Sequence, residues 1–227
     1  MPVDSPPPPY PIWPGGSNYA RRGVWQGARL VPGVTLRTTA RLRPALARMR
    51  PRGLMLSVVQ AACAALELHP RLNYFNLDGR LVWAGRPARV AVVLERPDHS
   101  CELVVVARAH RLERRRLDRL LRPRPQPPSP GLWDRLRERL PRACYRAERA
   151  SGRLARRLVA QSAPLFVSLL GLPGIEELAF TPTHAMALYP AWPREGVLPL
   201  TLCFSHQLAN ARPAARMLLT IRELLED

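Results

Sequence analysis

The last thirty residues of the chain constrain its fold most, because a buried strand is followed there almost at once by an amphipathic helix. The apolar run Leu198–Phe204 ends abruptly at Ser205, which predicts a buried strand that opens into a loop. Beyond Pro213, which suits the first turn of a helix, apolar side chains recur at helical spacing. The predicted buried face of this helix consists of Met217, Leu218, Ile221, Leu224 and Leu225.

Similar patterns divide the rest of the chain into strands and helices. Alternating or β-branched runs predict strands at 34–42, 73–76, 80–83, 89–94, 102–107, 165–169 and 185–189. Helical spacing predicts helices at 46–49, 56–68, 111–121 and 132–160. Ser57 is the predicted cap of the second of these helices, after a break at Pro51 and Gly53. The elements together predict an α/β fold, a two-layer sandwich in which helices cover one face of a mixed sheet.

Composition bounds the domain organisation. The chain has 227 residues, of which 47% are hydrophobic, and this is enough for one sizeable core. Residues 1–33 are rich in Pro and Gly and are predicted to form an extended arm, while residues 34–227 are predicted to form a single domain. No apolar stretch is long enough to span a bilayer, and no secretory signal is visible.

The cysteines favour a reducing compartment. Cys63, Cys101, Cys144 and Cys203 stand far apart, with no Cys-x-x-Cys pair. This spacing predicts reduced, buried thiols and no metal site. Together with the lack of a secretory signal, it predicts a cytoplasmic protein.

The positive charge is unevenly distributed. All 35 basic residues are arginine and the net charge is +18; the absence of lysine excludes a Schiff-base or lipoyl-lysine role. Residues 108–160 hold 17 arginines against five acids, a field that attracts anions. Three interpretations stay open: solvated helix faces, a surface for phosphates such as those of coenzyme A, and an anionic membrane surface. Charge alone allows nucleic-acid binding, but no recognised motif predicts specific binding to nucleic acid.

One histidine stands where chemistry is expected. His206 follows the predicted strand at its rim, and Asn210 lies four positions further on, about one turn if that stretch coils. An imidazole at such a place can act as a general base near neutral pH. The alternatives are that His206 only closes a loop and that Asn210 caps the last helix, for which Asn is well suited.

The order of strand, His-x-x-x-Asn, small residue and helix resembles the C-terminus of the acyltransferase component of 2-oxo acid dehydrogenase complexes. That family shares its fold with chloramphenicol acetyltransferase. Residues 57–83 resemble its helix, His-Pro-x-Leu-Asn and strand segment, and residues 164–192 resemble its Ser-x-x-Gly strand and Thr-Pro segment. The three segments stand in the family's order. The chain has nothing like the lipoyl or subunit-binding domains that precede the catalytic domain in those complexes, so we expect a stand-alone relative.

The resemblance implies a function and a site. It implies direct transfer of an acyl group from a thioester, with acyl-CoA as co-substrate and no permanently bound cofactor, to a small-molecule or lipoyl-like acceptor. His206 would be the general base, Ser168 would hydrogen-bond the oxyanion, and Asn210 would help to order the site. The family is trimeric, so a homotrimer or a multiple of trimers is implied. His206 of one subunit would then face Ser168 of its neighbour.

The chain also departs from the family's usual string. Ser205 and Gln207 replace an Asp and an Arg, Asn210 replaces an Asp, and Ala211 replaces a Gly. These changes favour an alternative hypothesis, a non-catalytic relative that serves as a trimeric scaffold or binding protein. The other histidines are predicted to be non-catalytic, with His99 and His110 in exposed polar stretches and His69 and His184 in structural or pocket-lining positions.

Overall fold

The computed structural model describes residues 33–77, 80–95, 101–123, 163–168, 186–206 and 208–227. Its elements, in chain order, are β1 (Gly33–Arg41), α2 (Pro44–Ala47), α3 (Pro51–Leu68), η1 (Pro70–Leu72), β2 (Tyr74–Leu77), β3 (Arg80–Trp83), β4 (Arg89–Glu95), β5 (Cys101–Ala107), η2 (Ala109–Arg111), α4 (Arg114–Leu120), β6 (Leu165–Val167), β7 (Met186–Pro190), β8 (Val197–Ser205) and α8 (Ala211–Glu226). The predictions for residues 1–32, for the helix 132–160, and for His99, His184 and Gln207 lie outside the described residues.

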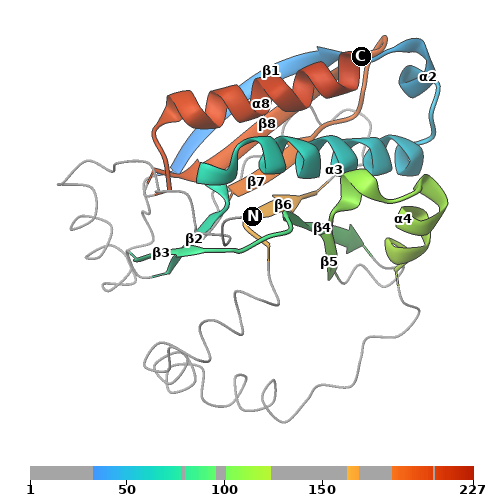
Figure 1. The fold of residues 1–227 in the computed structure, drawn as a ribbon. Helices are drawn as coiled ribbons and strands as arrows, with labels where there is room; N and C mark the ends of the chain where they lie inside the picture. The colour runs from blue at the N-terminus through green and yellow to red at the C-terminus, as the bar shows by residue number, and fades with distance from the viewer. Residues whose placement is uncertain (1–32, 78–79, 96–100, 124–162, 169–185, 207) are drawn as a thin grey trace.

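The core element is a six-stranded mixed sheet with the strand order β1-β8-β7-β6-β4-β5. Strand β6 pairs in parallel with β4 and β7, and the other neighbours in this sheet are antiparallel. Strands β2 and β3 form a separate hairpin. Helices α3 and α8 lie side by side over one face of the sheet (Figure 1). The predicted mixed sheet with helices on one face is therefore confirmed.

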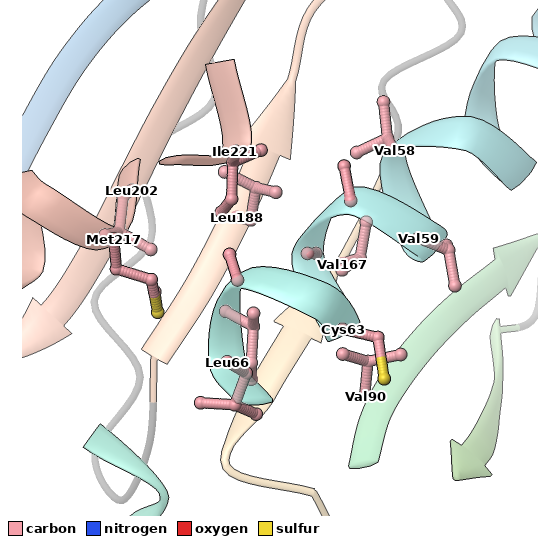
Figure 2. Packing of buried hydrophobic residues seen from close by; sticks show 14 of the residues in the cluster. Val58, Val59, Cys63, Leu66, Val90, Val167, Leu188, Leu202, Met217 and Ile221 are labelled. Atoms are coloured by element: carbon pink, nitrogen blue, oxygen red, sulfur yellow. The ribbon is translucent and has the colours of Figure 1, made fainter. Parts of the chain in front are cut away.

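The hydrophobic core fills the space between these two helices and the sheet. Figure 2 shows Leu66 of α3 and Met217 of α8 in one cluster with Leu188 of β7 and Leu202 of β8. All four side chains are completely buried. Burying one such side chain contributes roughly 1.5–3 kcal/mol, so this layer holds the helices on the sheet. No helix among the described residues is both long and apolar enough to cross a membrane.

Strand β8 is buried on both of its faces. Leu202 and Phe204 belong to the core beneath the helices. Because side chains alternate along a strand, Cys203 and Ser205 point to the opposite face, and both are completely buried as well. There Cys203 contacts Thr35 of β1, with 3.6 Å between Sγ and Oγ1. Burial on both faces explains why this segment is an apolar run and lacks strict alternation.

Helix α3 begins earlier than the sequence predicts. It starts at Pro51, which is accepted in the first turn of a helix, and it includes Gly53. Ser57 is therefore not a cap, as predicted, but a buried residue inside the helix. Arg114 of α4 packs against this first part of α3. Its guanidinium donates to the carbonyl oxygen of Gly53 at 2.5 Å and to Ser57 Oγ at 3.2 Å. A Cβ at Gly53 would stand only 3.1 Å from this guanidinium.

The buried face of α8 was predicted correctly except at one residue. Met217, Leu218, Ile221 and Leu225 are buried, but Leu224 is 38% exposed. The buried stripe follows positions three and four apart, and Leu224 stands at its edge. The two adjacent leucines therefore make different contributions to stability.

We expect Leu225→Ala to lower the free energy of unfolding by about 2–5 kcal/mol, because it leaves a cavity in the core. Leu224→Ala removes the same atoms from a partly exposed site and should cost less than about 1 kcal/mol. Urea denaturation, monitored by circular dichroism, measures the free energy of unfolding of both variants. Equal losses for the two variants would contradict the assigned face of α8.

Candidate functional site

His206 directly follows strand β8. The strand ends at Ser205, and the N–H of Leu208 donates to the carbonyl oxygen of Ser205 at 2.9 Å, which turns the chain. Ser205 is completely buried, whereas the His206 side chain is exposed. The predicted strand end before His206 is confirmed. The buried strand fixes the backbone up to the imidazole and leaves the ring accessible.

Asn210 occupies the N-cap position of α8. Its backbone is extended, with φ −73° and ψ 165°, but its side chain makes no capping hydrogen bond. The prediction that Asn210 caps the last helix is therefore correct for its position, but its side chain does not form the expected capping hydrogen bond. The carboxamide is half-buried, and it carries both donors and an acceptor that can serve a neighbouring group.

Ser168 stands at the end of strand β6. Its N–H donates to the carbonyl oxygen of Leu188 at 3.1 Å, which continues the parallel pairing of β6 with β7. The side chain is half-buried. Alternation along β6 places Ser168 on the face opposite to Leu165 and Val167, which are core residues under the helices.

Within one chain, Ser168 and His206 lie at opposite edges of the sheet. Val167 pairs with Leu188, so Ser168 is level with Tyr189, which pairs with Thr201 of β8. Ser205 lies four residues beyond Thr201, which is about 13 Å further along the strand. Strands β6 and β8 are also separated by β7, or about 10 Å across the sheet. The two side chains therefore do not meet in a single chain.

Tyr189 is a neighbour of Ser168 that the sequence analysis missed. It stands beside Ser168 on the adjacent strand and on the same face of the sheet. Burial, and to a smaller extent the nearby Cys203, raise the pKa of Tyr189 to about 12. The phenol therefore keeps its proton at neutral pH. Only the pairing of β6 with β7 reveals this proximity, because the two residues are far apart in the sequence.

Two other histidines serve the packing of α3. His69 contacts Thr220 of α8, with 3.0 Å between Nε2 and Oγ1. His110 was predicted to be exposed, and this is wrong: its side chain is only 19% exposed. Its Nδ1 lies 3.5 Å from Cys63 Sγ, and its Nε2 lies 3.1 Å from a carboxylate oxygen of Glu67. Residues 109–111 form a short helical turn against α3, which draws the imidazole inward.

Two cysteines, Cys63 and Cys203, are free and buried. Cys63 and Cys203 form no disulfide. Burial is the main cause that raises the pKa of the Cys63 thiol, so it stays protonated and unreactive near neutral pH. In the described part of the chain, no group of three or more His, Cys, Asp or Glu side chains could hold a metal ion.

Known structures resemble this chain in fold rather than in sequence. A probable dihydrolipoamide acetyltransferase from Listeria monocytogenes aligns with a TM-score of 0.58 and 14% identity, over 97% of this chain and 94% of that one. A chloramphenicol acetyltransferase aligns with a TM-score of 0.55 and 15% identity, over 94% and 95% of the two chains. The dihydrolipoamide acetyltransferase of Azotobacter vinelandii aligns with a TM-score of 0.53 and 19% identity, over 100% and 96%.

The chain has the chloramphenicol acetyltransferase fold. This confirms the fold that the three sequence segments implied. No protein-family model matches the sequence, and no curated protein matches it either. The fold is therefore assigned from the arrangement of the sheet and its two helices, which aligns with known structures over nearly the whole chain.

The histidines on α3 and η2 predict a pH dependence of stability. Burial lowers the pKa of His69, with a smaller contribution from Arg216, and burial also lowers the pKa of His110 against the opposing effect of Glu67. Below the ordinary imidazole pKa of about 6.5, the unfolded chain then binds more protons than the folded one. Stability should therefore fall as the pH is lowered from about 7 through this window.

The measurement is the urea midpoint at several pH values between about 5.5 and 7.5. The double variant His69→Gln/His110→Gln should show a smaller slope with pH than the wild type. An unchanged slope would contradict the assigned environments of the two rings.

Proposed function

We propose that the protein is an acyltransferase that moves an acyl group from an acyl-CoA to a thiol, hydroxyl or amine acceptor. The fold, shared with acetyltransferases, supports acyl transfer as the kind of reaction. The single observation that carries the proposal is the exposed His206, which a doubly buried strand fixes at the sheet edge. An imidazole so held can take a proton from an acceptor that approaches from solvent.

The spacing of the polar residues supports the assignment. The catalytic mechanism of the Azotobacter vinelandii enzyme has been investigated through the roles of a serine, a histidine and an asparagine, of which the last two are four positions apart. In this chain His206 and Asn210 are also four positions apart, and Ser168 precedes them. An asparagine after the histidine therefore has a counterpart in an acetyltransferase of the same fold.

The proposed reaction is a direct transfer. The imidazole of His206 removes the proton of the acceptor as the acceptor atom attacks the thioester carbonyl. Ser168 donates a hydrogen bond to the oxyanion that forms, an interaction whose loss typically costs about 2.7–4 kcal/mol in the barrier. The oxyanion then collapses, the carbon–sulfur bond breaks, and the imidazolium returns its proton to the departing CoA thiolate.

The separation of the two groups requires two copies of the chain. Since Ser168 and His206 lie at opposite edges of one sheet, we propose that His206 acts on substrate held by Ser168 of a neighbouring subunit. A closed ring of subunits repeats such a head-to-tail interface without leaving an open end. A trimer, or a multiple of trimers, is the assembly that we propose, with acyl-CoA as a transient co-substrate.

A second candidate is the non-catalytic scaffold, and one observation favours it. Among the described residues, no side chain hydrogen-bonds to the imidazole of His206. A general base is usually oriented by such a partner. Ser205, which stands where the family has an aspartate, is buried and supplies no carboxylate. The scaffold hypothesis predicts no turnover with any donor.

The test is a thiol-release assay with a panel of acyl-CoA donors and of thiol, hydroxyl and amine acceptors. We expect turnover with at least one pair. His206→Ala should lower kcat by at least about a hundredfold, and Ser168→Ala by roughly a hundredfold or more. The matched control, His69→Gln, removes an imidazole from a packing contact with Thr220 and should leave kcat nearly unchanged. Full activity of His206→Ala on a substrate that the protein uses would refute the proposed mechanism.

A further inference from the structure

A second surface, separate from the proposed active site, is built where α4 docks on the start of α3. The docking contacts are specific: Arg114 reaches Gly53 O at 2.5 Å and Met49 Sδ at 2.9 Å, and Arg52 forms an ion pair with Asp118 at 2.5 Å. Figure 1 shows α2 and α4 on either side of the N-terminal end of α3. These contacts bring two arginine-rich segments of the chain together.

Five arginines around this junction form what we call the arginine corner: Arg48, Arg50, Arg115, Arg116 and Arg119. Each is exposed, and none has an acidic partner in the described parts of the chain. Two further arginines, Arg52 and Arg122, share the carboxylate of Asp118.

The charge of this region is strongly one-sided. With Arg114, its eight arginines face only two carboxylates, Glu113 and Asp118, which leaves a net charge of +6. The hydrogen bond from Arg52 is the main cause that lowers the pKa of Asp118, so this carboxylate stays charged. One of the two acids is thus already paired, and the corner as a whole attracts anions.

Helix α4 holds part of the corner in a fixed orientation. Leu117 and Leu121 are completely buried on its inner side. Arg115 and Arg119 are four residues apart and therefore project together from the opposite side. Leu120, which is 48% exposed, lies on the flank next to Arg116, one turn earlier. A large apolar side chain is thus presented to solvent within a field of guanidinium groups.

The corner lies at the end of β8 that is remote from His206. Leu42, two residues before α2, donates its N–H to the carbonyl oxygen of Gly196 at 2.8 Å, and Gly196 directly precedes β8. His206 follows the other end of this nine-residue strand. The corner therefore lies far from the His206 of its own chain.

We propose that the arginine corner binds an anionic lipid surface. Guanidinium groups match headgroup phosphates, and each basic residue near such a surface contributes attraction. Leu120 favours a bilayer over a nucleic acid, because its side chain can enter the boundary between headgroups and acyl chains. The corner contains no aromatic residue, so it lacks the side chains on which single-stranded bases stack.

The test is the co-sedimentation of the full chain with vesicles of phosphatidylcholine alone and with about one-third phosphatidylglycerol, in low salt. Binding is expected only to the anionic vesicles. The triple variant Arg115→Gln/Arg116→Gln/Arg119→Gln should weaken it by about a hundredfold. The matched control, Arg37→Gln/Arg212→Gln/Arg216→Gln, removes the same charge from exposed sites on β1 and α8 and should weaken it by less than about threefold. Equal losses for both triple variants, or no binding to anionic vesicles, would overturn the proposal.

Leu120→Gln separates a bilayer from a nucleic acid. It should weaken vesicle binding by about three- to tenfold, because a partly buried leucine is lost from the interface. It should leave any binding of a duplex DNA probe unchanged, since that binding depends on charge. If the variant binds vesicles as tightly as the wild type does, or if the wild type prefers the duplex, the lipid assignment is wrong.

Discussion

The burial of strand β8 on both faces is the constraint on which the rest of the structure depends. Leu202 and Phe204 anchor the helical layer, while Cys203 and Ser205 are buried on the opposite face. A shift of one residue in the pairing would exchange these two faces. The packing that stabilises the core therefore also fixes the register of β8 and, with it, the place where His206 emerges.

The same register explains why one chain cannot complete the proposed site. Strand β6 runs parallel to β7 and antiparallel to β8, so the ends of β6 and β8 point to opposite edges of the sheet. Ser168 and His206 each follow one of these ends. Both groups are held by strands rather than by long loops, which suits a reaction that needs fixed donor and base positions. A second copy of the chain is then the simplest source of the missing partner.

Much of this arrangement could be predicted from the sequence, because hydrophobic patterning is a local signal. The doubly buried β8, the amphipathic α8 and the strand pair β4–β5 all appear as short patterns in consecutive residues. The errors arise where distant residues decide the outcome. Ser57 is no cap because Arg114, 57 positions later, contacts it inside a helix that starts at Pro51. His110 is drawn inward by Cys63 and Glu67.

The candidate site shows the same limit. His206 and Asn210 could be found because they are neighbours in the sequence, and Ser168 was found through its resemblance to a family segment. The proximity of Tyr189 to Ser168 becomes visible only when the pairing of β6 with β7 is known. The arginine corner could not be defined from the sequence either, because its halves meet through the contact of Arg52 with Asp118, 66 positions apart.

The shared active site is the central claim, and a mixing experiment tests it most directly. Subunits with His206→Ala and subunits with Ser168→Ala, each expected to be nearly inactive alone, are combined by co-expression or by unfolding and refolding together. If each site takes its histidine and its serine from different subunits, about a quarter of the sites in randomly mixed assemblies regain both groups. We predict recovery of about a quarter of the wild-type acyl-transfer rate. A mixture no more active than its two components would contradict a site built between subunits.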